Sequence, residues 1–108
     1  MRQFTVVFTP RSERQIASLY AYIAEHSGER RAEKFVGGII AACQSLMNFP
    51  ERGTKRDDIR LSLRTMGFAR RATIAFSVDV AAKVVTIHGA FYGGQDFESV
   101  LRDAENDE

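Results

Sequence analysis

The sequence predicts an α+β fold: an N-terminal strand, a helical hairpin, a three-stranded antiparallel meander and a short C-terminal helix. Two patterns carry this prediction. Apolar residues recur at helical spacing between residues 10 and 47, and they alternate with polar residues at strand spacing between residues 59 and 89. Because the helices and the meander each have an apolar face, we expect the helical hairpin to pack on one face of the sheet.

The first strand is expected at residues 3 to 8, directly before Thr9 and Pro10. Thr suits the N-cap of a helix and Pro suits its first helical position, so a helix begins at Pro10. Gly28 ends this helix. Its apolar stripe, spaced at i, i+3, i+4 and i+7, consists of Ile16, Leu19, Tyr20 and Ile23.

A second amphipathic helix is expected from residue 29 to residue 47, which completes the helical hairpin. Cys43 lies in its apolar stripe and is interpreted as a small buried side chain without a chemical role. Gly37 and Gly38 lie in mid-helix, where each costs about 1 kcal/mol relative to Ala. Either another element approaches them closely or they are tolerated at exposed positions, and both interpretations stay open.

The meander is expected to begin with a strand at residues 59 to 66, in which Ile59, Leu61 and Leu63 alternate with polar residues. Residues 68 to 92 follow as a hairpin of two strands. The core between the helices and the sheet is expected to contain Leu19, Ile23, Phe35, Ile39, Leu46, Ile74, Phe76 and Ile87.

A short C-terminal helix is expected after Gly93 and Gly94, with an apolar side formed by Phe97, Val100, Leu101 and Ala104. The sequence has no internal repeat, low-complexity tract or linker. At 108 residues, of which 44% are hydrophobic, the chain fits one domain over residues 1–108 with a single core.

Several classes of protein are excluded by composition. The only cysteine, Cys43, excludes an internal disulfide, and no group of Cys and His has metal-ligand spacing, so neither a metal nor a cofactor is predicted. No apolar run approaches the roughly 18 residues of a membrane span, and the N-terminus lacks a secretory signal. We therefore expect a cytoplasmic protein with no membrane association.

The net charge of +1 hides an uneven distribution. Between Arg52 and Arg71, seven basic residues face two acids, whereas between Gln95 and Glu108 six acids face one arginine. If the expected strand at residues 59 to 66 pairs with the hairpin, its arginines share a face with Arg71. That basic sheet face suits nucleic acid or an acidic protein.

The order of these elements resembles the RelE/ParE superfamily of toxins from bacterial type II toxin-antitoxin systems, and within it the ParE-like branch. The resemblance covers Phe4 to Leu101. Its motifs are FPERG followed by RDDI, the pair Leu63 and Arg64, IAF at residues 74 to 76, and the closing VTIHGAFYGGQDFESVL. None of these is a catalytic motif, and the specificity lies in their order and spacing.

The resemblance implies a growth-arresting toxin that inhibits DNA gyrase and is neutralised, in a hetero-oligomer, by a small ParD-like antitoxin encoded beside it. Two alternatives are a RelE-like endonuclease that cleaves messenger RNA on the ribosome and a non-toxic protein that only binds an antitoxin. The residues expected to contact the target are Arg60, Arg64, Arg70 and Arg71. Those expected to contact the antitoxin are Leu19, Tyr20, Ile23, Phe91, Tyr92 and Phe97.

Cleavage of RNA without a metal needs a general base, a group that protonates the leaving oxygen, and cations around the phosphate. His88 and Tyr92 are candidates for proton transfer, and Arg60, Arg64 and Arg71 are candidates for phosphate binding. However, no Asp or Glu occupies a polar position of these strands, and a solvated basic face would show the same pattern. A gyrase inhibitor needs only a complementary surface, so the sequence favours binding over catalysis.

Overall fold

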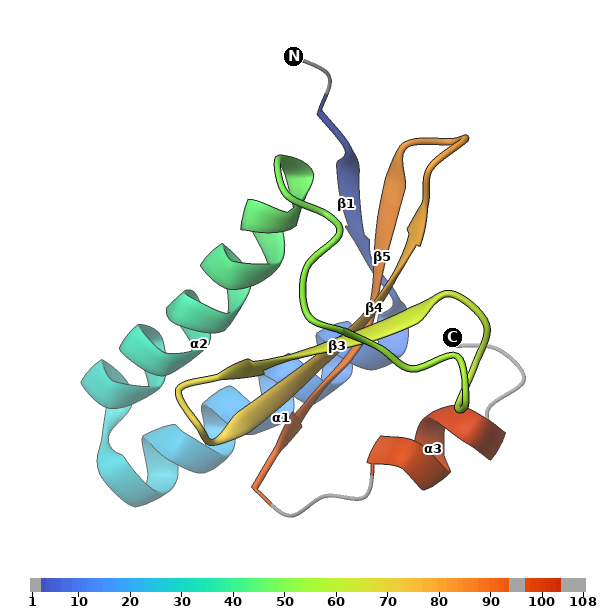
Figure 1. Cartoon of the computed structure of the whole chain (residues 1–108). Helices are drawn as coiled ribbons and strands as arrows, with labels where there is room; N and C mark the ends of the chain where they lie inside the picture. The colour runs from blue at the N-terminus through green and yellow to red at the C-terminus, as the bar shows by residue number, and fades with distance from the viewer. Residues whose placement is uncertain (1–2, 94–96, 104–108) are drawn as a thin grey trace.

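The computed structural model describes residues 3–93 and 97–103, in which two long helices cover one face of a five-stranded sheet (Figure 1). The order of strands across the sheet is β1-β5-β4-β3-β2. β1 pairs with β5 in parallel, and the other neighbours are antiparallel. The strands are β1 (Thr5–Phe8), β2 (Thr54–Lys55), β3 (Leu63–Phe68), β4 (Ala72–Asp79) and β5 (Val84–Tyr92). The predicted α+β fold is confirmed, and the two-residue β2 is an addition to it.

The two long helices form the predicted hairpin. α1 (Pro10–Ser27) starts after Thr9, whose hydroxyl oxygen accepts a hydrogen bond from the backbone N–H of Ser12 at 3.1 Å. Gly28, with φ 97°, makes the turn and donates its N–H to Ala24 at 3.0 Å. α2 (Glu29–Gln44) then runs back and ends in the short 3₁₀ helix η1 (Ser45–Met47).

The main core lies between this hairpin and the sheet, as predicted. Ile39, Leu46, Ile74, Phe76 and Ile87 are 0% exposed. The other predicted core residues join the same cluster, with Leu19 and Ile23 buried and Phe35 partly buried. Cys43 is also buried there, and burial raises the pKa of its thiol to about 12, so it stays protonated and unreactive.

The two glycines of α2 have different roles. A methyl group at Gly38 would come within 2.5 Å of the ring of Phe68, so here the helix needs the smallest residue to let β3 approach. At Gly37 a methyl group would meet nothing within 4 Å. The sequence left two interpretations open: close approach holds for Gly38, and a tolerated exposed position holds for Gly37.

The strand expected at residues 59 to 66 is wrong in its first half, because β3 begins only at Leu63. Residues 56 to 62 form a turn, in which the carbonyl of Arg56 accepts from Ile59 at 3.0 Å and Asp57 accepts the backbone N–H of Ser62 at 2.9 Å. Ser62 has a positive φ of 68°. The turn buries Ile59 and leaves Leu61 87% exposed, so the apparent alternation is not that of a strand.

A register shift in the β4–β5 ladder decides which face the end of β5 presents. Ala75 pairs with Gly89 and Phe76 pairs with Ile87, so His88 is an extra residue on β5, as in a β-bulge. Ile87 packs in the core under the helices, and beyond the shift Tyr92 lies against that same core. Phe91 instead belongs to the cluster on the other face of the sheet.

The short helix α3 (Phe97–Asp103) covers part of that other face. The residues of this second cluster are Ile59, Leu63, Ala75, Phe91 and Leu101. Strand alternation places hydroxyl side chains on the same face, among them Thr65, Thr73, Ser77 and Thr86. Arg64 pairs with Phe76, whose side chain faces the helices, so Arg64 lies on the helical side instead. The expected basic sheet face is therefore wrong.

Candidate functional site

The two residues predicted to transfer protons are on opposite faces of the sheet. His88 is 8% exposed, and its Nε2 lies 2.8 Å from the hydroxyl oxygen of Ser77 on β4. Tyr92 is half-buried on the helical side, where its ring meets that of Phe35 edge-on at 5.6 Å. Without the register shift, both side chains would share one face. The shift separates them, so one phosphate cannot contact both.

The predicted phosphate-binding arginines are also apart. Arg64 lies near the start of β3, and its Nη1 donates to the carbonyl of Arg52 at 3.2 Å. Arg71 follows the β3–β4 turn, and its Nη1 lies 3.5 Å from the hydroxyl of Tyr92. Because a strand rises about 3.3 Å per residue, the two arginines are separated along β3 by about 15 Å. Arg60 belongs to the turn before β3.

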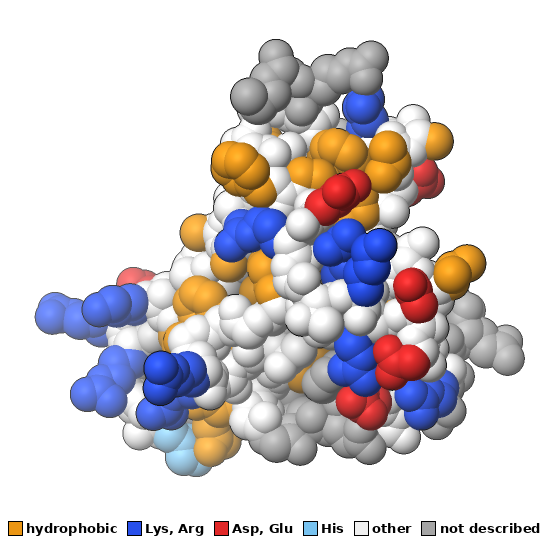
Figure 2. All heavy atoms as spheres, in the orientation of Figure 1, with side chains coloured by type: hydrophobic (Ala, Val, Ile, Leu, Met, Phe, Trp, Pro, Cys, Tyr) orange, Lys and Arg blue, Asp and Glu red, His pale blue; other side chains and the backbone are white. Residues whose placement is uncertain are grey.

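One end of the molecule concentrates cations. There a groove of about 510 Å³ lies between the α1–α2 hairpin and the β3–β4 turn, and its charged lining residues are Arg31, Lys34 and Arg71. We call it the Arg71 groove. Figure 2 shows Lys and Arg side chains gathered at the lower left, where Figure 1 places the α1–α2 connection and the β3–β4 turn. No carboxylate lines the groove within the described part of the chain.

A second groove of about 620 Å³ adjoins the first, between α1 and the end of β5. Its charged lining residues are Arg11 and Arg14, and we call it the Arg14 groove. Tyr22 and Tyr92 line both grooves, with ring centroids 6.4 Å apart. These two tyrosines therefore form the ridge over which one groove continues into the other.

The ridge is part of a row of aromatic rings. His26 stacks on Tyr22 with centroids 4.2 Å apart, and its Nδ1 donates to the carbonyl of Tyr22 at 2.8 Å. On the other side, Tyr92 meets Phe35, and Phe35 meets Phe68 at 5.3 Å. The row runs from the exposed ring of Tyr22, which is 53% exposed, to the partly buried Phe68. The exposed ring of Tyr22 is therefore supported by Tyr92, which packs against the partly buried Phe35.

The turn beside the Arg71 groove has an unfavourable backbone. Ala69 and Arg70 have φ values of 53° and 59°, and the N–H of Arg71 donates to Phe68 at 3.0 Å. Two central residues with positive φ define a type I′ hairpin turn, which favours Asn-Gly. Ala and Arg in these positions cost about 1 to 2 kcal/mol each. The turn thus places Arg70 at its tip and Arg71 directly after it, and this conformation lowers the stability of the fold.

A third groove lies between α1 and α2, beside Phe8 of β1, and is almost entirely apolar. It measures about 450 Å³ and is lined by residues that include Phe8, Ile16, Tyr20, Val36 and Ile40. We call it the hairpin groove. Burial raises the pKa of the Tyr20 phenol, and the neighbouring Glu33 and Glu29 add to this effect. The phenol stays neutral at physiological pH and donates a hydrogen bond to Glu33.

The residues predicted to bind an antitoxin differ in accessibility. Leu19, Ile23 and Phe91 are 7%, 8% and 3% exposed, so they belong to the buried core of the fold. Leu19 and Ile23 form part of the floors of the Arg14 and Arg71 grooves. Tyr20 and Tyr92 are half-buried and line grooves. The side chain of Phe97 lies outside the described residues.

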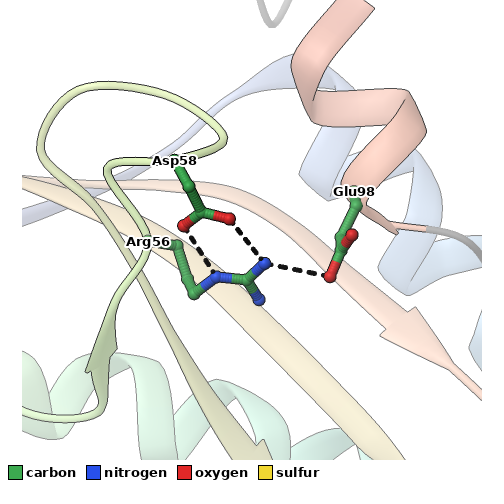
Figure 3. Close-up of polar contacts among 3 residues, drawn as sticks. All are labelled: Arg56, Asp58 and Glu98. Atoms are coloured by element: carbon green, nitrogen blue, oxygen red, sulfur yellow. Dashed lines mark hydrogen bonds and ion pairs between the residues drawn. The ribbon is translucent and has the colours of Figure 1, made fainter.

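The other end of β3 carries arginines that are bound within the fold. Arg56 donates two hydrogen bonds of 3.0 Å to the carboxylate of Asp58 and one of 2.9 Å to Glu98 of α3 (Figure 3). The hydrogen bonds from Arg56 lower the pKa of Asp58, and both carboxylates raise the pKa of Arg56. This network links α3 to the turn before β3, so Arg56 has a structural role.

The described ranges, 3–93 and 97–103, contain neither a membrane-spanning helix nor a metal site. No helix there is both long and apolar enough to cross a bilayer. No cluster of three or more His, Cys, Asp and Glu side chains in those ranges is placed to hold a metal ion.

Comparison with solved structures shows which known fold the chain has. The fold is similar to a chain of the chromosomal ParDE toxin-antitoxin system from P. aeruginosa, with TM-score 0.71 and 19% identity over 83% of this chain and 96% of that chain. It is also similar to a chain of the toxin-antitoxin complex RelBE2 from Mycobacterium tuberculosis, with TM-score 0.62 and 16% identity over 88% of this chain and 97% of that chain. The fold is thus one that also occurs in the ParDE and RelBE2 toxin-antitoxin systems.

The sequence identifies the family. Residues 6–89 match the family described as the ParE toxin of type II toxin-antitoxin system, parDE. The chain therefore belongs to the ParE toxin family, as its motifs predicted. A search of curated proteins returned no match.

Sequence reasoning missed five residues of the cationic grooves, namely Arg11, Arg14, Tyr22, Arg31 and Lys34. Each lies outside the apolar stripe of its helix, where a polar or exposed residue has no distinctive signal. The available signal was the clustering of cations near the α1–α2 connection. Only the fold shows that this connection lies beside the β3–β4 turn.

Proposed function

We propose that this ParE-family toxin arrests growth by binding DNA gyrase, without a catalytic step of its own, and is neutralised by a ParD-like antitoxin. The observation that carries the proposal is the separation of His88 from the cations. His88 is buried beside Ser77 on one face of the sheet, whereas Arg71 and Tyr92 lie at the other face. A general base must lie within hydrogen-bond reach of the proton that it removes, and this arrangement gives His88 no such access.

The proposed contact with the target is the end of the molecule that carries Arg70 and Arg71. Both arginines are exposed, and Nη1 of Arg71 lies 3.5 Å from the hydroxyl of Tyr92, whose ring packs against Phe35. Arg64, by contrast, is held by the carbonyl of Arg52, and Arg60 lies in the turn that α3 covers. We therefore assign target binding to Arg70 and Arg71 and a structural role to Arg64.

The hairpin groove is the proposed contact for the antitoxin. It is apolar, and Tyr20 at its edge supplies a hydroxyl that is already bonded to Glu33. An amphipathic helix places its apolar side chains in such a groove. Both similar structures come from toxin-antitoxin systems, which supports a hetero-oligomer with a small antitoxin.

The experiment is induced expression with and without the neighbouring small open reading frame, followed by assays of gyrase supercoiling and of message integrity. We expect growth arrest that the neighbouring gene relieves, loss of supercoiling activity, and intact messages. Cleaved messages together with normal supercoiling would support the RelE-like alternative. Normal growth together with a copurifying complex would support the non-toxic alternative.

A further inference from the structure

We propose that the Arg71 groove and the adjoining Arg14 groove bind a single strand of nucleic acid. Cations along the groove walls would contact the phosphates, and the ring of Tyr22 would stack on a base. This inference goes beyond the proposed function, because it concerns a ligand of the isolated chain and needs neither gyrase nor an antitoxin.

Charge is the first argument. All charged residues that line the Arg71 groove are cations, and the same holds for the Arg14 groove within the described residues. Four of these five lining cations are arginines, whose planar guanidinium group contacts phosphate oxygens in pairs. The phosphate backbone supplies most of the affinity for sequence-independent binding.

The rings are the second argument. Proteins that bind single strands combine a cationic groove with aromatic side chains on which bases stack. Tyr22 is 53% exposed on the ridge between the two grooves. His26 stacks against it on one side, and Tyr92 and Phe35 support the row on the other. The ring of Tyr22 is therefore presented to solvent in a fixed position.

An acidic peptide is the competing ligand, and the exposure of the lining residues argues against it. A peptide would insert aliphatic side chains, but Leu19 and Ile23 on the groove floors are 7% and 8% exposed. What a ligand meets is mainly the ring of Tyr22, the partly exposed Tyr92 and the cations. Flat rings beside guanidinium groups match bases and phosphates better than they match aliphatic side chains.

The strained turn is a third, independent argument. Ala69 and Arg70 occupy left-handed conformations that Asn and Gly would adopt at lower cost. Such strain clusters at functional sites, where the surrounding structure maintains it. Here it places Arg70 and Arg71 at the tip of the turn, beside the Arg71 groove. The backbone strain is explained if Arg70 and Arg71 contact a ligand.

The test is fluorescence anisotropy of a labelled oligothymidine of about 12 nucleotides, titrated with the purified full chain at several salt concentrations. We expect saturable binding that weakens with salt. Lys34→Gln and Arg71→Gln should each lower the affinity and reduce the slope of log affinity against log salt by about 0.7. Tyr22→Ala should weaken binding about tenfold, and Tyr22→Phe should restore it.

The matched control is Lys55→Gln, which removes one exposed cation from β2 at the other end of the sheet and should leave the affinity within about twofold. All variants should keep the thermal midpoint of the parent. The proposal is overturned if no salt-dependent binding occurs, or if Lys55→Gln weakens binding as much as Arg71→Gln. A polyglutamate peptide of equal charge that displaces the oligonucleotide as well as unlabelled oligothymidine would equally overturn it, in favour of an acidic protein ligand. None of these results bears on gyrase inhibition, which is assayed separately.

Discussion

The arginines at the two ends of β3 differ in what they contact. At the Leu63 end, Arg56 is bonded to Asp58 and Glu98, and Arg64 is bonded to the carbonyl of Arg52. At the Phe68 end, Arg70 and Arg71 are exposed on a strained turn next to the Arg71 groove. The two sets have the same charge and lie in one basic segment of the sequence. Their place in the fold, not their charge, decides which of them is available to a ligand.

The largest expected effect concerns the sheet that joins the two ends. Phe76 is 0% exposed at the centre of the main core, so Phe76→Ala should lower the free energy of unfolding by about 3 to 5 kcal/mol. Phe49 is 65% exposed, and Phe49→Ala should change the free energy of unfolding by less than about 0.5 kcal/mol. Urea unfolding followed by circular dichroism measures both. Equal midpoints for the two variants would mean that the core has been wrongly located.

The turn at the Phe68 end should become more stable when its strain is removed. The double substitution Ala69→Asn and Arg70→Gly supplies the residues that a type I′ turn favours, so we expect a gain of about 1 to 2 kcal/mol in the free energy of unfolding. If the strain serves a ligand, the same variant should lose toxicity on induced expression. A variant that is more stable and fully toxic would show that the turn has no part in target binding.

Substitution of one arginine at each end separates structure from binding. Arg64→Gln removes the hydrogen bond to the carbonyl of Arg52, so it should cost about 1 kcal/mol of stability. Arg71→Gln should leave stability almost unchanged, since Arg71 is exposed and its 3.5 Å contact with the hydroxyl of Tyr92 is long for a hydrogen bond. Chemical denaturation of the two purified variants gives the comparison. Equal destabilisation by both would remove the distinction between the two ends.

The smallest effect is expected at acid pH. The hydrogen bonds from Arg56 hold the pKa of Asp58 below its usual value of 3.8. Because the pKa is lower in the folded chain than in the unfolded chain, the interaction stabilises the fold above about pH 4 and is lost as the pH falls through the folded pKa. Between about pH 4 and pH 2 the thermal midpoint should therefore fall further in the parent than in Asp58→Asn. If the thermal midpoints of the two proteins fall equally with pH, Asp58 does not contribute to the pH dependence of stability.

The sequence was sufficient for the fold because its main signals are local. Thr9 and Pro10 start α1, Gly28 ends it, and the alternation around Phe76 identifies β4, all from neighbouring residues. These signals depend on capping, backbone preference and period, which tertiary contacts here reinforce.

The candidate site was less predictable because two of its determinants are not local. The extra residue at His88 reverses the faces of β5, and its one sign in VTIHGAFY is Gly89, since a glycine within a strand can mark a bulge. The turn at residues 56 to 62 shows the same alternation as a strand, and α3 packs beside it through the contact between Arg56 and Glu98, which are 42 residues apart. Pattern alone therefore placed Arg60, Arg64 and Arg71 together on one face, whereas in the fold Arg64 and Arg71 lie at opposite ends of β3 and Arg60 lies in the preceding turn.

The central claim is that this toxin acts by binding through the Arg70 and Arg71 end and not by proton transfer at His88. The most direct measurement is inhibition of DNA supercoiling by purified gyrase with three forms of the toxin: the parent, His88→Ala and Arg71→Glu. Folding of each is checked by circular dichroism. We predict that the parent and His88→Ala inhibit equally and that Arg71→Glu inhibits at least tenfold less, on the order of one lost charged contact. Full inhibition by Arg71→Glu, or no inhibition by any form while the parent cleaves messenger RNA and folded His88→Ala does not, would contradict the claim.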